Sequence, residues 1–305
     1  MLNQKDKRVI GTYETGNEGP LLLVSAGIHG NEPSGVIALQ KVFTKLEEEK
    51  PEISGKIIGV YGNKAALAKK VRYIDEDLNR TWTEKNVNSK KTDTSEKDEM
   101  FDIIEIVKKN TSAVDTSYFL DCHTTSSDSL PYISVQEVGN NDAWAHRFPV
   151  YIIRGFSDIV SGCIDHYLSR IGITGFVFEG GQHESKDAIA YHEGMIWLAL
   201  KHACNLDLEN LTTYPKAVLK VERQKEHQKT FEIVHRHSLE DGDKFEMEGG
   251  YENFQAIKKG EFLATHNGKR ILSSWDSFIF MPLYQVQGND GFFVVDEVDE
   301  KISSS

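Results

Sequence analysis

An apolar run is followed directly by a His and a Glu in the stretch Leu21-Leu22-Leu23-Val24-Ser25-Ala26-Gly27-Ile28-His29-Gly30-Asn31-Glu32-Pro33. The run Leu21–Ile28 is short and continuously hydrophobic, which predicts a buried strand. In α/β proteins, ligands usually bind at the carboxyl ends of the strands. A His and a carboxylate at such a point can hold a divalent metal and leave positions open for water and substrate. This stretch therefore predicts a metal site at the end of a buried strand.

Length and composition describe an ordinary globular chain. The 305 residues suffice for one large domain and a smaller one, and 39% hydrophobic residues exclude a disordered chain. The net charge of -12 argues against a nucleic-acid or membrane partner, because either would require a basic surface. No apolar run could span a bilayer, and the polar residues 1–8 contain no signal core. Three widely spaced cysteines suggest no disulfide framework, so we expect a reduced, cytoplasmic protein.

Strand and helix patterns alternate over the first two thirds of the chain. Apolar positions between Pro33 and Glu49 recur at helical spacing, and further short apolar runs lie at 56–63, 118–123 and 174–179. Ser95 is a suitable N-cap for another helix, which ends near Lys108. This alternation predicts an α/β fold whose mostly parallel sheet is covered on both faces.

The pattern changes after about residue 215. Short alternating segments separated by turns fill residues 220–298, and one of these turns is Asn267-Gly268. Asn-Gly between alternating segments is a strong hairpin signal, because both residues tolerate positive φ. The sequence thus predicts a catalytic domain at 1–215 and a small antiparallel β domain at 216–305.

Three predicted strand ends supply a recurring set of polar side chains. His29 and Glu32 follow the first strand, His123 ends the run at 118–123, and Glu179 ends the run at 174–179. A parallel sheet would bring these ends together. Two His and one Glu are a known catalytic zinc set, in which zinc lowers the pKa of a water toward ~7. Another carboxylate must then move the proton to the leaving nitrogen, and Glu179 is the candidate.

Other interpretations of these residues have to be weighed. A lone His or Glu after a strand is more often structural than a ligand. A phosphate-binding loop at 27–35 is excluded by the missing Gly-Lys-Ser/Thr ending and because Glu32 would repel a phosphate. The polar island Arg72–Trp82 holds two Arg and an Asn that can grip a carboxylate. Composition alone favours a solvated loop in which these Arg residues pair with neighbouring acids.

Four ordered motifs make the chain resemble the aspartoacylase/succinylglutamate desuccinylase family, whose members are related to zinc carboxypeptidases. The matching pieces are Gly27–Glu32, Arg72 with Asp77–Arg80, Asp121–Thr124 and Phe178–Gly181. The resemblance covers nearly the whole chain. It implies a three-layer α/β/α zinc-carboxypeptidase-like catalytic domain, with a mostly parallel or mixed sheet, followed by a small C-terminal antiparallel β domain.

The resemblance also assigns roles to single residues. It implies one zinc ion per chain, bound by His29, Glu32 and His123, with Glu179 as general base and then acid. Substrate contacts are implied for Arg72 at the oxyanion, for Asn79 and Arg80 at a carboxylate, and for Arg170, with Arg154 as a rival, at a second carboxylate.

The expected function is a zinc-dependent amidohydrolase that cleaves the amide bond of an N-acyl amino acid, a carbon–nitrogen bond other than a peptide bond. Alternatives are a zinc carboxypeptidase, a deacylase of non-acidic N-acyl substrates, and a non-catalytic zinc protein that binds a small carboxylate.

His183 is expected to be structural or to support the site. Cys122 should point away from His123, which argues against a Cys–His nucleophile. The number of subunits, a homo-oligomer included, stays open.

Overall fold

The computed structural model describes residues 8–156, 159–285 and 289–298, and the polar ends at 1–7 and 303–305 lie outside these ranges. One mixed sheet runs through the described chain in the order β1-β3-β2-β4-β7-β5-β6-β8-β14-β13-β10. Its strands are β1 (Val9–Glu14), β2 (Leu21–Ala26), β3 (Lys56–Tyr61), β4 (Ser117–Thr125), β5 (Tyr132–Ser134), β6 (Tyr151–Arg154), β7 (Thr174–Gln182), β8 (Thr230–Ser238), β10 (Gln255–Ile257), β13 (Ser277–Phe280) and β14 (Asp290–Val298).

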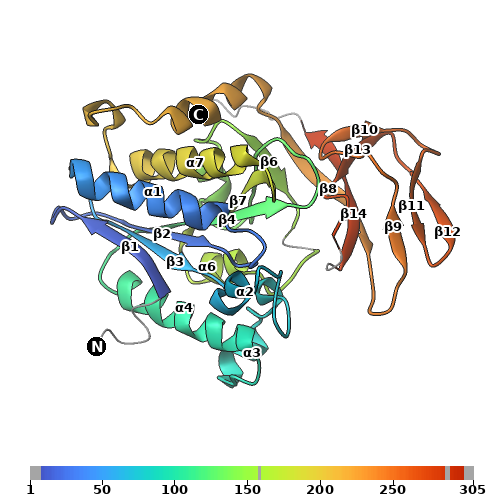
Figure 1. The fold of residues 1–305 in the computed structure, drawn as a ribbon, viewed down its shortest axis with the longest axis horizontal. Helices are drawn as coiled ribbons and strands as arrows, with labels where there is room; N and C mark the ends of the chain where they lie inside the picture. The colour runs from blue at the N-terminus through green and yellow to red at the C-terminus, as the bar shows by residue number, and fades with distance from the viewer. Residues whose placement is uncertain (1–7, 157–158, 286–288, 299–305) are drawn as a thin grey trace.

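Helices cover both faces of this sheet, which confirms the predicted α/β architecture (Figure 1). One layer contains α1 (Ser34–Glu49), α7 (Lys186–Cys204) and α8 (Lys216–Glu222), and the opposite layer contains α2 (Lys64–Lys69), α3 (Glu84–Ser89), α4 (Ser95–Thr111) and α6 (Ile164–Arg170). The short helix α5 (Asn141–Ala145) packs with the core of the first layer. Short 3-10 turns follow at η2 (Leu78–Arg80), η3 (Leu208–Asn210) and η4 (Arg223–His227).

Strand β2 shows why the first apolar run is continuous in hydrophobicity. All six of its residues are buried. Leu22, Val24 and Ala26 pack in the core beneath α1 and α7, whereas Leu21 and Leu23 pack in the core beside α4 and α6. A strand covered on both faces needs apolar side chains at every position.

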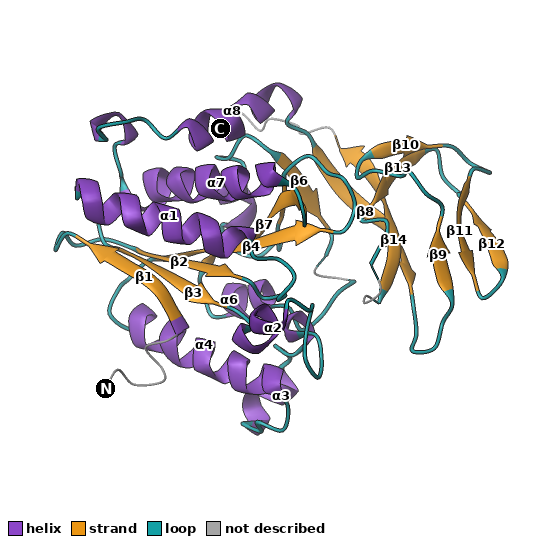
Figure 2. Ribbon diagram, in the orientation of Figure 1, coloured by secondary structure: helices purple, strands orange, loops and turns teal. Residues whose placement is uncertain are grey.

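The C-terminal region continues the main sheet. β8 pairs in parallel with β6 and antiparallel with β14, which carries the sheet on to β13 and β10. A second, three-stranded antiparallel sheet consists of β9 (Phe245–Met247), β11 (Phe262–His266) and β12 (Lys269–Leu272), at the far right of Figure 2. The predicted antiparallel strands are therefore present. Because the main sheet crosses residue 215, the division into two domains stays a prediction.

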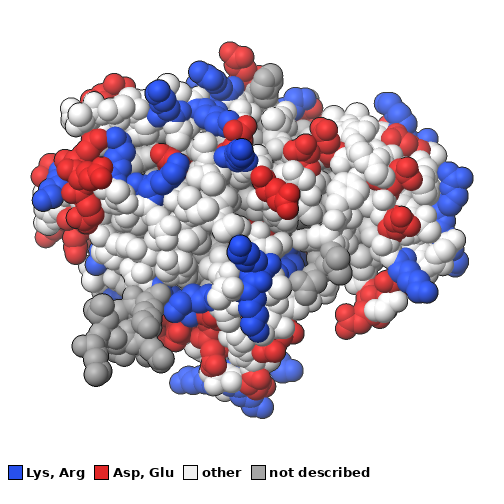
Figure 3. Space-filling view, in the orientation of Figure 1, with Lys and Arg blue, Asp and Glu red and all other residues white. Residues whose placement is uncertain are grey.

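Element boundaries differ slightly from expectation. Thr94, not Ser95, caps α4, since its hydroxyl accepts a hydrogen bond from the Lys97 N–H at 3.3 Å. Acidic and basic side chains intermix over the face of the molecule seen in Figure 3. None of the described helices is long and apolar enough to cross a membrane.

The contact between α7 and α8 generates a stability prediction. A Cβ atom at Gly194 of α7 would lie 2.3 Å from the carbonyl oxygen of Ala217 in α8. Helix propensity alone would make Gly194→Ala stabilising by about 1 kcal/mol. We expect the steric overlap to win, with a loss of about 1–3 kcal/mol in the free energy of unfolding, measured by urea denaturation. Gly249→Ala is the control because a Cβ there meets no atom within 4 Å; equal stability of both variants would contradict the packing argument.

Candidate metal centre and active site

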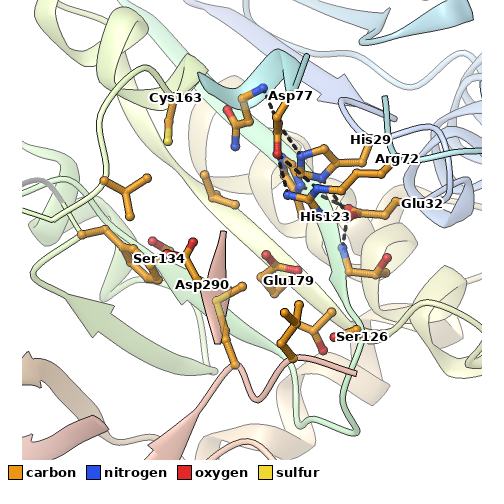
Figure 4. A pocket seen from close by; sticks show the side chains of 18 of the residues that line it. His29, Glu32, Arg72, Asp77, His123, Ser126, Ser134, Cys163, Glu179 and Asp290 are labelled. Carbon is orange, nitrogen blue, oxygen red and sulfur yellow. Dashed lines mark hydrogen bonds and ion pairs between the residues drawn. The ribbon is translucent and has the colours of Figure 1, made fainter. Parts of the chain in front are cut away.

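Three buried side chains meet where β2 and β4 end. His29 and Glu32 lie in the turn between β2 and α1, and His123 lies near the end of β4. The parallel pairing of the two strands sets Ala26 beside Cys122 and so aligns their ends. The Glu32 carboxylate contacts both imidazoles, with 2.8 Å from Oε1 to His29 Nδ1 and 3.1 Å from Oε2 to His123 Nδ1. The three candidate ligand atoms lie within 4.8 Å of one another (Figure 4).

A carboxylate holds the far nitrogen of each imidazole. Asp77 Oδ1 lies 3.1 Å from His29 Nε2, and Asp121 Oδ2 lies 2.8 Å from His123 Nε2. The Ser25 hydroxyl donates to the other oxygen of Asp121 at 2.7 Å. Histidines that bind metals are usually oriented by such a carboxylate on the second ring nitrogen. Both Nδ1 atoms are thereby directed at the centre of the cluster.

The electrostatics of the cluster favour a bound cation. Burial disfavours the charge of Glu32, yet His29 and His123 lower the pKa of its carboxyl well below the usual value. Burial likewise opposes a proton on His123, but Asp121 and Glu32 raise its pKa well above the usual value. Positive charge is thus stabilised between the imidazoles and the carboxylates. Two imidazole nitrogens and one carboxylate also match the donors that zinc prefers, so the residues fit the ion.

Glu179 lies beside this cluster and has a raised pKa. It pairs in register with His123 across β4 and β7 and is 8% exposed. Its Oε2 atom has no hydrogen-bond partner among the described residues. Burial raises the pKa of Glu179 to about 8, although His123 opposes the shift. A carboxyl in this state can both accept and donate a proton near neutral pH.

Arg72, Asn79 and Arg80 all line the same pocket as the cluster and Glu179. Arg72 grips Asp77 through Nε and Nη2, at 3.1 and 2.9 Å, and its Nη1 lies 3.8 Å from Glu32. Arg80 bonds to Asp290 of β14 at 3.3 Å. Composition alone favours a loop in which both arginines pair with acids of the same loop, and only Arg72 does so, with Asp77.

Arg170 is not brought to the pocket. It ends α6, where it contacts Glu84 at 3.2 Å, and it is absent from the pocket lining. Arg170 ends α6 shortly before Thr174, the first residue of β7, whereas Glu179 lies near the other end of that strand. The rival Arg154 binds Asp142 through two contacts of 2.7 and 2.8 Å. Sequence distance from Glu179 was therefore a poor guide to a second carboxylate site.

Two histidines support the site from behind and beside it. His192 of α7 contacts the His123 carbonyl through Nε2 at 2.9 Å, and its ring occupies the space that a Cβ at Gly180 would fill. His183 lines the pocket and contacts the Thr124 hydroxyl at 2.8 Å. Helical periodicity marks His192 only as a core residue, so the sequence offered no signal for its contact with His123.

Comparison with known proteins agrees with this geometry. The model of the succinylglutamate desuccinylase/aspartoacylase catalytic domain matches residues 18–186. The chain belongs to this family. Succinylglutamate desuccinylase of Pseudomonas aeruginosa is 26% identical over 115 residues, which are 38% of this chain and 33% of that protein. Human N-acyl-aromatic-L-amino acid amidohydrolase (carboxylate-forming) is 33% identical over 107 residues, 34% of this chain and 33% of the relative.

The matches therefore span about a third of the length of these sequence relatives. The fold agrees over a longer stretch. A crystal structure of succinylglutamate desuccinylase/aspartoacylase from Rhodobacter sphaeroides superposes with a TM-score of 0.68 and 16% identity, over 93% of this chain and 87% of that one.

The buried His192 predicts an acid-sensitive fold. Burial lowers the pKa of His192 to about 4, whereas an unfolded His titrates near 6.5. The unfolded chain then binds more protons below pH 6.5, so the folded state loses stability as the pH falls from 6.5 to 4. We expect His192→Gln, which keeps a donor and cannot titrate, to reduce the stability lost between pH 7 and pH 5 by on the order of 2 kcal/mol. Urea denaturation at both pH values measures it; an unchanged pH dependence would contradict the assignment.

Proposed function

We propose that this protein is a zinc-dependent amidohydrolase that removes the acyl group from an N-acyl amino acid. The observation that carries the proposal is the buried Glu179 carboxyl, whose Oε2 atom has no hydrogen-bond partner among the described residues and which pairs in register with His123 of the His29–Glu32–His123 cluster. A protein that only binds a small carboxylate has no need of such a group. The names of the relatives, a desuccinylase and an N-acyl amino acid amidohydrolase, support the same reaction class.

The chain's own residues divide the reaction between them. Zinc held by His29, Glu32 and His123 would polarise the acyl carbonyl and lower the pKa of the attacking water. Glu179 takes a proton from that water as the new carbon–oxygen bond forms. It then delivers the proton to the nitrogen as the carbon–nitrogen bond breaks, leaving a carboxylic acid and a free amino acid.

Arg72 and Arg80 are assigned to different negative charges, the developing oxyanion and the substrate carboxylate. Arg72 is held by Asp77 with its Nη1 directed toward Glu32, which suits it to the developing oxyanion. Arg80 and Asn79 are assigned the carboxylate of the amino acid, where a guanidinium would orient the substrate within the pocket. A role for Arg170 at a second carboxylate has no support in its position. Zinc as the physiological metal, a cytoplasmic location and the number of subunits stay predictions.

The general base is tested by Glu179→Gln. We expect the variant to bind zinc as the unmodified protein does and to lose about three orders of magnitude or more in kcat, because an amide cannot carry the proton. Hydrolysis of N-acetyl amino acids, followed by amine release, measures the loss. Glu184→Gln, an exposed residue five positions on, is the matched control and should keep full turnover. Near-normal turnover in Glu179→Gln would refute the role.

The metal site is tested by zinc titration against a chromophoric chelator. We expect one zinc per chain, no tight binding after His123→Ala, and affinity weakened about 10–100-fold after Asp121→Asn, which loses the carboxylate behind His123. His146→Ala, at the C-cap of α5 and outside the pocket lining, should bind zinc normally. Unchanged affinity in His123→Ala would place the ion elsewhere.

A further inference from the structure

The pocket extends well beyond the metal ligands, along one face of β5. Tyr132, Ser134 and Gln136 alternate along the chain and all line it, whereas the intervening Ile133 and Val135 pack in the opposite core. Tyr132 pairs with Glu179 and Ser134 pairs with Val177. Gln136 therefore lies four residues, about 13 Å of extended chain, from the reacting end. Figure 4 shows Ser134 and Cys163 across the pocket from the metal ligands.

The far end of the pocket is polar and incompletely satisfied. Gln136 Nε2 donates to Asp165 Oδ2 at 2.6 Å, and both side chains are 2% exposed. Among the described residues, Gln136 Oε1 and Asp165 Oδ1 have no hydrogen-bond partner. Both orphaned atoms are acceptors, so this end of the pocket lacks hydrogen-bond donors. A buried acceptor without a partner is costly, which makes a ligand that supplies donors favourable here.

The charges along the pocket also favour a ligand that supplies hydrogen-bond donors. The described lining residues include two arginines, Arg72 and Arg80, against five carboxylates, Glu32, Asp77, Asp165, Glu179 and Asp290. Arg72 is paired with Asp77, and Arg80 is paired with Asp290, which also accepts from Arg236 at 2.6 Å. Asp165 forms no ion pair with a described residue, and its side-chain partner is Gln136. Burial raises the pKa of the Asp165 carboxyl although Gln136 and His166 oppose the shift, and a cation bound beside Asp165 would lower that pKa further.

The carboxylate site adjoins this polar end. Asn79 Oδ1 accepts from the Ile164 N–H at 3.0 Å, and Arg80 Nη1 lies 3.6 Å from Cys163 Sγ. Residues 79–80 thus contact the start of α6, where Asp165 lies in the first turn. An amino acid whose α-carboxylate binds Arg80 would extend its side chain between β5 and α6, past the apolar Val160 and Cys163, toward Asp165 and Gln136.

We propose that Asp165 and Gln136 form the side-chain pocket for the leaving amino acid and select a long side chain that ends in a cationic hydrogen-bond donor, an ammonium group. This inference rests on the proposed deacylase function and names its substrate class. It also explains why the second arginine expected for an acidic substrate is absent from the described lining. An acidic side chain would meet the Asp165 carboxylate instead of a countercharge.

The test compares Nα-acetyl-lysine, Nα-acetyl-ornithine, Nα-acetyl-norleucine and Nα-acetyl-glutamate with the zinc-loaded protein. We expect kcat/KM for the lysine or ornithine derivative to exceed that of the norleucine derivative by about tenfold or more, with the glutamate derivative slowest. A preference for the glutamate or the norleucine derivative would overturn the proposal.

Asp165→Asn isolates the charge. It should raise KM for the lysine derivative and lower the ratio of kcat/KM for the lysine derivative to kcat/KM for the norleucine derivative about tenfold or more. Equal losses on both substrates would indicate a structural role and overturn the proposal. Asp187→Asn, which makes the same change in net charge on exposed α7 surface, should leave the preference unchanged.

Calorimetric binding of free lysine, norleucine and glutamate separates this inference from the proposed function. Lysine binding that is weakened by Asp165→Asn, in a protein that hydrolyses none of the acetyl derivatives, would support the pocket and refute the deacylase. Hydrolysis with no preference for lysine in binding or turnover would support the deacylase function and refute the side-chain pocket.

Discussion

The Glu32 carboxylate, buried between two imidazoles, is the interaction on which the site depends. A charge with 2% exposure is tolerable only beside compensating groups, and His29 and His123 are the groups that approach it. Their positions follow from the fold, because β2 and β4 are parallel neighbours whose ends coincide. Asp77 and Asp121 then fix the two rings from outside. The donor atoms of the cluster are therefore already oriented as the proposed cation site requires.

In the proposed reaction, the pocket separates the reacting groups from the recognition groups along one strand pair. Glu179 of β7 lies at the proposed reacting end, and Tyr132, Ser134 and Gln136, which begin in the antiparallel partner β5, lead away from it. The C-terminal strands take part in this wall, since Asp290 of β14 joins Arg80 to Arg236 of β8. The late part of the chain thus helps to hold the residue assigned to the substrate carboxylate. Substrate choice and metal chemistry can then vary independently.

Much of the reacting end could be predicted from the sequence. Apolar runs ending in His29, Glu32, His123 and Glu179 locate one edge of a parallel sheet, and the sheet rule alone brings them together. Arg170 lies outside the pocket lining because it ends α6 beside Glu84, whereas the start of the same helix reaches the pocket, and sequence distance from Glu179 does not reveal this difference. Asp165 and Gln136 carried no signal, because β5 has only three residues and a buried acid in a short helix resembles a solvated one. The parallel pairing of β8 with β6 is a long-range contact without a local pattern.

We propose that one cation binds between His29, Glu32 and His123. X-ray absorption at the zinc edge of protein loaded with one equivalent tests it directly, because imidazole, carboxylate and thiolate ligands scatter differently. We expect a shell of nitrogen and oxygen with the outer scattering of two imidazoles, and no sulfur. Sulfur in the shell, or scattering from fewer than two imidazoles, would contradict it.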